Sequence, residues 1–507
     1  MELGRRAFLM TAAVGAAATA AVACSPVERR PVASSTAVAP RVPPAEPTPP
    51  DWAKLRTQLA GRLVLASDAG YGATKQAYNP LFDSRRPAAV AQCTRPEDVQ
   101  ACVTVAAASR IPIAARSGGH SYAGYSTPEN GLVVDLADMK GVEVHDDGTA
   151  VIDAGARLID VYAALAAAGR CLPAGSCPTV GISGLTLGGG VGVLTRKYGL
   201  TCDRVRSMRV VTPDGRLRTA SHDSEADLFW ALRGGGGGNL GIVTSFTFDT
   251  VPAPALTVFQ LRFPGGSVAD VLGAWQGFTG SAPDEFWSTL VVSGGTPPTC
   301  RLTGCYVGSP DGLSPLLAQL TARAGVAATS RYVQAMGYLD AMRWFGGCSS
   351  KSVDQCHPGW NGAGQLDRES FVASSRVMTG AVDDPARIAT LMSGRAGMDV
   401  LIDSLGGAVA RIAPADTAFP YRSAIATVQI YQSTGVASAN AVTQSVADVR
   451  GQLGDELGSK GYVNYIDPEL PDWANAYYGA NLPRLRAVAK SYDPDGVFAF
   501  AQGLTKA

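Results

Sequence analysis

The chain has 507 residues, of which 46% are hydrophobic and 17% charged. This length allows two or three domains with substantial cores, and the hydrophobic fraction excludes a largely disordered protein. Lys and Arg (43) balance Asp and Glu (43) and no basic stripe is visible, so nucleic acid is not expected as a partner. The 58 glycines and the low charge favour an enzyme rich in strands and tight loops over a helical assembly.

The first 24 residues resemble an export signal. Residues 4–9 resemble the twin-arginine type, and the alanine-rich run 10–23 is too short and too weakly hydrophobic for a comfortable membrane span. Residues 21–25 fit either a lipobox, with a lipid on Cys24, or ordinary signal-peptidase cleavage. Residues 25–50, rich in Pro and Ala, predict an extended tether. We therefore expect a secreted or envelope-anchored protein that touches a membrane only through a lipid on Cys24.

The ten cysteines of an exported chain are candidates for disulfides, because export leads to an oxidising compartment. With Cys24 and Cys177 set aside, eight remain, which leaves the overall connectivity open. The pair that we predict is Cys348 with Cys356, which share a short polar loop. No metal is expected, since Cys-x-x-Cys pairs are absent and the chain has only four histidines.

Residues 51–255 predict a first α+β unit. The region opens with a helix and an irregular approach at 51–83, and Asp146-Asp147-Gly148 predicts a hairpin turn. The glycine-rich stretch 174–199 cannot be simple helix or strand throughout. Strands are predicted at 88–93, 111–115, 133–136, 149–153, 205–211, 217–220 and 242–248, and helices from Arg95 and at 158–168 and 224–232.

From about residue 256 the pattern changes to alternating strands and helices, which indicates a separate antiparallel domain that we place at 256–460. The last segment, 461–507, is predicted to hold a strand at 461–466 and a helix at 483–491. In the middle domain, strands are predicted at 257–263, 287–292, 299–307 and 421–431.

A loop between two predicted strands, Arg116-Ser-Gly-Gly-His120-Ser-Tyr122, is the first motif with chemical content. Adjacent glycines permit a tight turn whose N–H groups bind anions, and Arg116 can add charge or donors. His120 itself could be a bystander, a base or an attachment point. Cys177, next to Pro178, could be held near a ligand or be a buried or disulfide-bonded cysteine. The glycines of 234–238 follow a helix and precede a strand, the wrong order for a Rossmann turn.

Five motifs occur together in order: residues 116–126, 175–184 (Gly-Ser-Cys-Pro-Thr-Val-Gly-Ile-Ser-Gly), 196–200, 233–243 and 478–498. They resemble the berberine bridge enzyme-like family of vanillyl-alcohol oxidase-type flavoproteins. The resemblance covers about residues 80–250 and 460–505. It implies an α+β fold with a two-part FAD-binding domain of the vanillyl-alcohol oxidase type (51–255), an antiparallel-sheet substrate domain (256–460), and a C-terminal segment that returns to the FAD domain and the active site.

The resemblance further implies FAD held by two covalent bonds, from His120 to the 8α-methyl carbon and from Cys177 to C6. The pyrophosphate would lie over the backbone of 116–121 and 179–184, and the adenine near 239–243. The implied cofactor-binding residues are His120, Cys177, Arg116, Ser117, Gly118, Gly119, Ser121, Thr179, Val180, Gly181, Ser183, Gly184, Gly188, Gly192, Asn239, Gly241, Ile242, Val243, Tyr462 and Asn464.

Tyr465 matches the position of the family's catalytic tyrosine, and Tyr122 and Gln429 match active-site positions of relatives. An unperturbed tyrosine pKa of ~10 makes a poor base, so Tyr465 would need a neighbouring cation, a second tyrosine or hydrogen bonds that stabilise the phenolate. Val191 and Thr427 depart from the family's pattern, in which an aromatic residue and, in some plant members, a lysine stand.

The resemblance implies an exported FAD-dependent oxidase that takes a hydride from the hydroxyl-bearing carbon of an alcohol, a sugar or a secondary metabolite and passes the electrons to O2, giving H2O2. Val180 resembles the smaller residue of members that react readily with oxygen. Two alternatives stay open: a flavin dehydrogenase that uses a quinone or another carrier, and a catalytically inactive anchored binding protein, which would hold no flavin.

Overall fold

A computed structural model describes residues 47–359, 363–435 and 438–506. The export signal, Cys24 and nearly all of the predicted tether lie outside these residues. Within the described part of the chain, no helix is both long enough and apolar enough to span a bilayer.

The first sheet has four strands in the order β1-β2-β4-β3, with β4 parallel to β2 and β3 and with β1 antiparallel at the edge. Helix α3 begins with a proline and two acidic residues in its first turn, which suit the positive end of the helix dipole. The elements of this part are β1 (Arg62–Leu65), β2 (Ala89–Gln92), β3 (Ile113–Arg116), β4 (Leu132–Asp135), α1 (Trp52–Gln58), α2 (Tyr71–Thr74), α3 (Pro96–Ser109) and η1 (Pro80–Phe82).

The second sheet is antiparallel, with the strand order β5-β6-β10-β8-β9, and a short pair β7-β11 accompanies it. The predicted hairpin at 146–148 joins β5 to β6. The elements are β5 (Val142–Val144), β6 (Thr149–Asp153), β7 (Arg170–Cys171), β8 (Val205–Val211), β9 (Leu217–Ser221), β10 (Ile242–Asp249), β11 (Val251–Pro252), α4 (Leu158–Ala167), α5 (Ile182–Leu187), α6 (Thr195–Tyr198), α7 (Ala226–Leu232) and η2 (Thr201–Arg204).

The third sheet has seven antiparallel strands in the order β15-β12-β14-β13-β17-β18-β16. Its strands are β12 (Leu256–Arg262), β13 (Phe286–Ser293), β14 (Thr299–Val307), β15 (Ser330–Met336), β16 (Phe371–Met378), β17 (Met398–Ser404) and β18 (Ala426–Ser433). The helical elements of this region are α8 (Val268–Thr279), α9 (Pro310–Ala324), α10 (Tyr338–Phe345), α11 (Pro385–Met392), α12 (Ala439–Leu457), η3 (Asp354–Cys356) and η4 (Gly407–Arg411).

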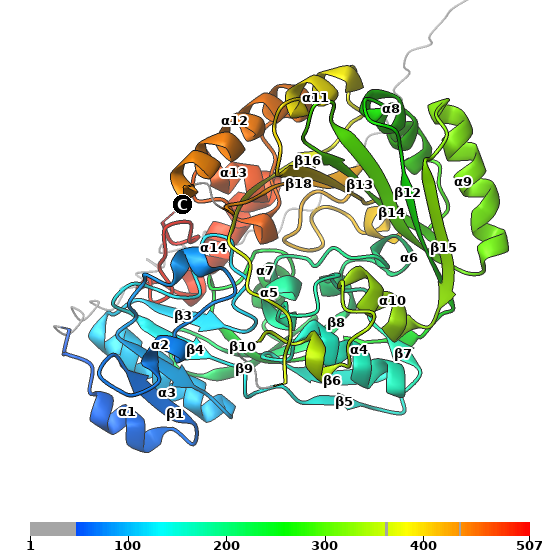
Figure 1. The fold of residues 1–507 in the computed structure, drawn as a ribbon. Helices are drawn as coiled ribbons and strands as arrows, with labels where there is room; N and C mark the ends of the chain where they lie inside the picture. Colours follow the sequence, from blue (N-terminus) through cyan, green and yellow to red (C-terminus); the bar gives the residue numbers. More distant parts are fainter. Residues whose placement is uncertain (1–46, 360–362, 436–437, 507) are drawn as a thin grey trace, which may run out of the picture. The chain divides into compact units, whose positions relative to one another are not determined.

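The two faces of this seven-stranded sheet differ in character. Since side chains alternate along a strand, Leu261, Leu302 and Ile402 share one face, where they are buried in a core with α8, α9, α11 and α12 (Figure 1). The opposite face carries polar residues such as Thr289 and Asp403, which are only partly buried. The first face of the sheet is therefore structural. The opposite face is shared: Val258, Trp287 and Cys305 on it are buried in a core with α10, whereas the stretch around Thr289 and Asp403 can contribute to a site.

The C-terminal segment packs into the core that the first two sheets share. It consists of η5 (Val463–Tyr465), α13 (Trp473–Tyr478), η6 (Gly479–Asn481) and α14 (Leu482–Tyr492). Tyr477, Tyr478 and Leu485 are buried in that core, and α14 lies against α7. The segment therefore brings η5 back to the first part of the chain.

Two predicted strands differ from the structure. The segment 461–466 is no strand, because its polar side chains bond to a glycine-rich loop: Gly190 donates to the Tyr462 hydroxyl (3.0 Å), and Asn464 donates to the Leu185 carbonyl (2.9 Å). The strand predicted from residue 421 begins only at Ala426. Tyr421 instead donates to the Ala476 carbonyl, so tertiary contacts override the local pattern.

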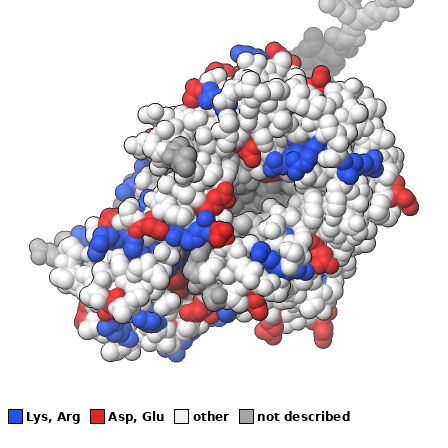
Figure 2. All heavy atoms as spheres, viewed as in Figure 1, with Lys and Arg blue, Asp and Glu red and all other residues white. Residues whose placement is uncertain are grey.

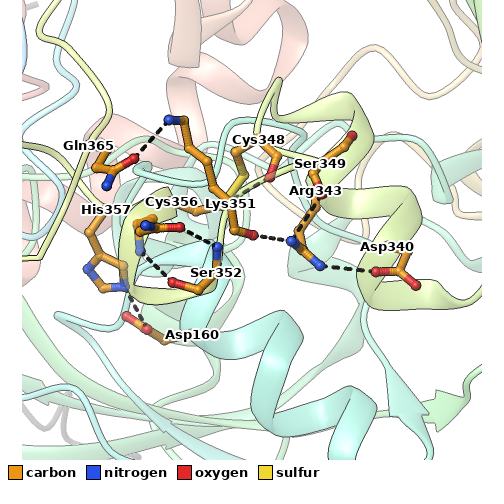
Figure 3. The surroundings of a disulfide bond; sticks show 11 residues. Asp160, Asp340, Arg343, Cys348, Ser349, Lys351, Ser352, Cys356, His357 and Gln365 are labelled. Atoms are coloured by element: carbon orange, nitrogen blue, oxygen red, sulfur yellow. Dashed lines mark hydrogen bonds and ion pairs between the residues drawn. A yellow bond between two sulfur atoms is a disulfide. The ribbon is translucent and has the colours of Figure 1, made fainter.

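The predicted disulfide Cys348–Cys356 is present (Figure 3). Next to it, His357 Nε2 lies 2.8 Å from Asp160 Oδ1, which ties this loop to α4. The wider expectation of several disulfides is wrong for the described residues. The seven other described cysteines are free, and six of them are buried, so they serve as small apolar core residues.

Candidate active site

A cavity of about 400 Å³ brings together the loop after β3, the segment that leads into α5, the loop before β10 and η5. Figure 2 shows a face of the molecule that is hollowed near its centre and carries charges of both signs. The sequence-predicted residues that line the cavity are Ser117, Gly118, Gly119, His120, Ser121, Tyr122, Cys177, Val180, Gly181, Ser183, Gly184, Asn239, Gly241, Ile242, Val243, Asn464 and Tyr465.

His120 and Cys177 converge on a single buried hydroxyl, that of Thr179. His120 Nε2 lies 2.8 Å from Thr179 Oγ1, and Cys177 Sγ lies 3.4 Å from the same oxygen. Arg157 donates to the Thr179 carbonyl (3.1 Å), which fixes the loop from the other side. Tyr78 stacks on the His120 ring with a centroid distance of 3.8 Å. With Nε2 engaged by Thr179, the second ring nitrogen, Nδ1, is left to react.

Burial also sets the protonation of both side chains. Burial and, as a smaller contribution, the nearby positive charge of Arg157 together lower the pKa of His120 to about 3, so the imidazole is neutral at physiological pH and keeps a nucleophilic lone pair. Burial raises the pKa of the Cys177 thiol, although hydrogen bonds from Thr179 and Val180 partly offset this effect. Both groups are therefore held at the cavity in their neutral forms.

The glycines of the cavity fit a bound group that approaches the backbone closely. A Cβ on Gly184 would meet no protein atom within 4 Å, so the space over this residue is open. Gly118 serves a different purpose, since a Cβ there would come within 2.3 Å of the Gly181 nitrogen. The absence of a side chain thus allows the His120 loop and the Cys177 loop to touch.

Five other sequence-predicted residues do not line the cavity: Gly188, Gly192, Thr179, Tyr462 and Gln429. A Cβ on Gly188 would come within 1.9 Å of the Asn464 side chain, and one on Gly192 within 1.7 Å of the Ala174 carbonyl oxygen. These two glycines therefore permit close packing of the elements that carry the site.

Arg116 differs from the sequence-based expectation that it adds charge to the ligand loop. Its guanidinium forms a buried ion pair with Asp135 (2.7 Å) and donates to the carbonyls of Thr74 and Lys75. The side chain lies in a second cavity, on the other side of the loop, and not in the cavity of His120. Arg116 thus anchors the loop to β4 and to the segment before β2.

Tyr465, Tyr122 and Gln429 lie together, as the sequence predicts. The rings of Tyr122 and Tyr465 stack 5.7 Å apart and almost parallel, and Gln429 Nε2 donates to the Tyr122 hydroxyl (2.6 Å). The partner of Tyr465 is a residue that the sequence reasoning missed. Its hydroxyl donates to Asp403 Oδ2 (3.2 Å), on the neighbouring strand β17.

Asp403 reverses the expected electrostatics of Tyr465. Burial and the negative charge of Asp403 both raise the pKa of Tyr465 well above its ordinary value, so no phenolate is stabilised. Burial likewise raises the pKa of Asp403. The alternation of Met398-Asp-Val-Leu-Ile-Asp403-Ser404 places Asp399 and Asp403 on one face of a strand, and this is the signal that could have found the pair.

Two family models match this chain. A family model described as "FAD binding domain" matches residues 87–221, and one described as "Berberine and berberine like" matches residues 461–505. No group of three or more His, Cys, Asp or Glu side chains among the described residues could hold a metal ion.

The FAD-linked oxidoreductase YgaK of Bacillus subtilis is 34% identical over 457 residues, which cover 89% of this chain and 98% of the relative. A xylooligosaccharide oxidase of Thermothelomyces thermophilus is 31% identical and matches 83% of this chain and 88% of its own length. The structure of BBE-like 1 from Physcomitrella patens superposes with a TM-score of 0.83 at 29% identity, over 89% of this chain and 98% of that one. The chain belongs to the berberine bridge enzyme-like family of FAD-linked oxidoreductases.

Proposed function

We propose that this enzyme is an exported carbohydrate oxidase that holds FAD through two covalent bonds, at His120 and Cys177, and uses O2 as its electron acceptor. Three relatives support the substrate class, since their names are xylooligosaccharide, chitooligosaccharide and glucooligosaccharide oxidase. The observation that carries the proposal is the convergence of a neutral imidazole and a thiol on Thr179 in the cavity that Tyr465 also lines.

The residues present fit the cofactor. His120 and Cys177 would hold the isoalloxazine ring, and the open space over Gly184 would admit the rest of the cofactor along the backbone. FAD, when bound there, supplies a hydride acceptor and returns the electrons to a second substrate. The part of the protein is to bind the sugar, to orient its C–H bond and to remove the hydroxyl proton.

Tyr465 and Asp403 together provide the path for that proton. The sugar hydroxyl gives its proton to the Tyr465 oxygen, while Tyr465 passes its own proton to the Asp403 carboxylate, 3.2 Å away. Neither residue suffices alone, because the raised pKa of Tyr465 makes its phenolate rare at neutral pH and Asp403 does not line the cavity. Gln429 donates a hydrogen bond to the Tyr122 hydroxyl, and Tyr122 stacks parallel to Tyr465, so this contact helps to position the Tyr465 ring.

Val180 favours O2 as the acceptor, since it lines the cavity three residues after Cys177 with a modest side chain that leaves room next to the flavin site. A dehydrogenase that passes electrons to a quinone is the second candidate. Flavin reoxidation under air and under a quinone in anaerobic solution separates the two, because an oxidase reoxidises rapidly in air and releases H2O2.

The test of the whole proposal uses the purified enzyme. After denaturation and acid precipitation, the wild-type polypeptide should keep its yellow colour. The single variants His120→Ala and Cys177→Ala should keep it as well, because one covalent bond to the flavin remains in each. The double variant should lose the colour. A panel of sugars and simple alcohols should give peroxide with the sugars. A colourless wild-type pellet refutes the covalent attachment, and peroxide from alcohols alone refutes the substrate class.

A further inference from the structure

The polar face of the seven-stranded sheet continues from the active site to the open edge of the sheet. Asp403 pairs in register with Thr289 on β13, which pairs with Thr303 on β14, and this row continues through Gln260 to Tyr332 on the edge strand β15. All of these side chains are partly or largely exposed. A row of polar side chains therefore runs across the sheet from Asp403, the hydrogen-bond partner of Tyr465, to the edge strand.

Two arginines stand opposite each other on this same face. Arg262 on β12 pairs in register with Arg301 on β14, and their neighbours Leu261 and Leu302 point into the helix-covered core. Neither guanidinium has a carboxylate within ion-pair distance or a side-chain hydrogen bond among residues 47–359, 363–435 and 438–506. Like charges directly opposite on adjacent strands are destabilising, so the fold gains nothing from this pair.

The arrangement is suited to a ligand with a negative charge. Two guanidinium groups on adjacent strands can both donate to one carboxylate, with a geometry that a single lysine cannot offer. Figure 2 shows Lys and Arg side chains beside the central hollow, near the strands β12–β15 of Figure 1.

The surroundings of the arginines are suited to sugar rings. Tyr332 is 42% exposed and stacks on Trp344 of α10, with a centroid distance of 5.6 Å and an interplanar angle of 6°. Such an aromatic pair at an edge offers a flat surface to the apolar face of a pyranose. Gln260 and Thr303, which form a hydrogen bond of 3.4 Å with each other, offer donors and acceptors to hydroxyl groups between the aromatic pair and the active site.

The spacing separates the arginines from the reacting atoms by more than one sugar unit. With strands ~4.8 Å apart and ~3.4 Å per residue, the Cα of Arg301 lies about 12 Å from that of Asp403, and the Cα of Arg262 about 16 Å away. A monosaccharide at Tyr465 cannot reach this pair, whereas a short oligosaccharide can.

We propose that the substrate is an acidic oligosaccharide, oxidised at the unit beside Tyr465 and bound through a carboxylate on a remote unit by Arg262 and Arg301. This proposal rests on the proposed function, because it names the kind of carbohydrate that the same site takes. Binding involves no further covalent step.

The experiment compares two trisaccharides on the flavin-loaded enzyme: cellotriose, and the same sugar with glucuronic acid at its non-reducing end. We expect kcat/KM to favour the acidic probe by about tenfold, through KM, which is the effect of one charge-assisted hydrogen bond. The preference should shrink at high salt, since the arginines are accessible to solvent.

The double variant Arg262→Gln/Arg301→Gln should lose the preference, keep the activity on cellotriose and, with the like charges gone, unfold at no lower temperature. Arg331→Gln is the matched control, because Arg331 is exposed on β15 but points to the other face of the sheet. Equal kcat/KM for both probes in the wild type, or the same loss in the control, overturns the proposal.

Calorimetric titration with both probes keeps this test independent of turnover. If neither sugar is oxidised, the proposed carbohydrate oxidation is wrong for these sugars. Tighter binding of the acidic probe that depends on Arg262 and Arg301 then still supports the arginine site, and equal binding refutes it.

Discussion

The substitution Asp403→Asn tests whether Tyr465 works as a base alone or through the carboxylate. Asparagine keeps the shape of the side chain and can still accept the Tyr465 hydrogen bond through its amide oxygen, but it cannot take up the proton. Since positioned acid–base groups typically contribute 10²–10⁴-fold, we expect kcat to fall by about 100-fold or more, or about 2.7 kcal/mol in activation free energy. KM for the sugar should change little, because Asp403 does not line the cavity.

The same proton path predicts how kcat depends on pH. Asp403 must be ionised to accept the proton, so kcat should rise with pH through its pKa, which burial holds above the ordinary range of a carboxyl group. In Asp403→Asn this rising limb should be absent, and the residual rate should not depend on pH over that range. Steady-state kinetics of sugar oxidation across the acid range measures both effects.

Asp399→Asn is the matched control. Asp399 lies on the same strand and the same face, four residues before Asp403, and pairs in register with Tyr431. It should keep most of the wild-type kcat and the acid limb. The proton path through Asp403 is refuted if Asp403→Asn stays within about twofold of the wild type, well below the 10²-fold lower bound for acid–base catalysis. Equal losses in both variants refute it as well.

Three further predictions concern stability and cofactor attachment. The raised pKa of Asp403 means that the folded protein binds a proton more readily than the unfolded chain, so the stability of the wild type falls as pH rises through that pKa. Asp403→Asn should therefore melt at a higher temperature than the wild type at neutral pH. Calorimetry should show that this difference disappears in acid. The Thr179 hydroxyl engages both His120 and Cys177, so Thr179→Val should lower the fraction of denatured polypeptide that carries flavin. Thr179→Ser keeps the hydroxyl and should keep the wild-type fraction. Equal fractions in Thr179→Val and the wild type contradict this role. Cys348→Ser should lower the free energy of unfolding by about 2–3 kcal/mol through the freed loop, measured by denaturant titration, and reductant should then leave the variant unchanged.

The sequence predicts the residues of the site that lie in glycine-bounded loops. The roles of His120, Cys177 and Tyr465 follow from the resemblance of their motifs to the berberine bridge enzyme-like family. Asp403 could not be found in this way, because Met398–Ser404 has the pattern of any half-buried strand. Which of its polar residues meets Tyr465 depends on the register of β17 between β13 and β18, and register depends on contacts between segments far apart in the chain.

The same limit applies to the side chain of Arg116, whose partner the local sequence does not identify. Its position beside two glycines suggested a ligand contact, but its partner is Asp135 on the adjacent parallel strand β4. A buried guanidinium is paired wherever an ionised carboxylate is in reach, because an unpaired buried charge is costly. The register of β3 with β4 brings the two residues opposite each other, and neither local motif encodes that register.

The proton path through Tyr465 also gives a reason for the presence of the Asp403 carboxylate, whose negative charge is unfavourable in the resting enzyme. In the resting enzyme the partly buried carboxylate of Asp403 raises the pKa of Tyr465, and burial raises its own pKa. As a hydride leaves the sugar, positive charge develops on the carbon and its hydroxyl proton becomes acidic, so the same negative charge then stabilises the transition state more than the bound sugar. An interaction that is stronger in the transition state than in the ground state is what accelerates a reaction. The stability gained by Asp403→Asn and the activity that it loses should therefore have one physical origin.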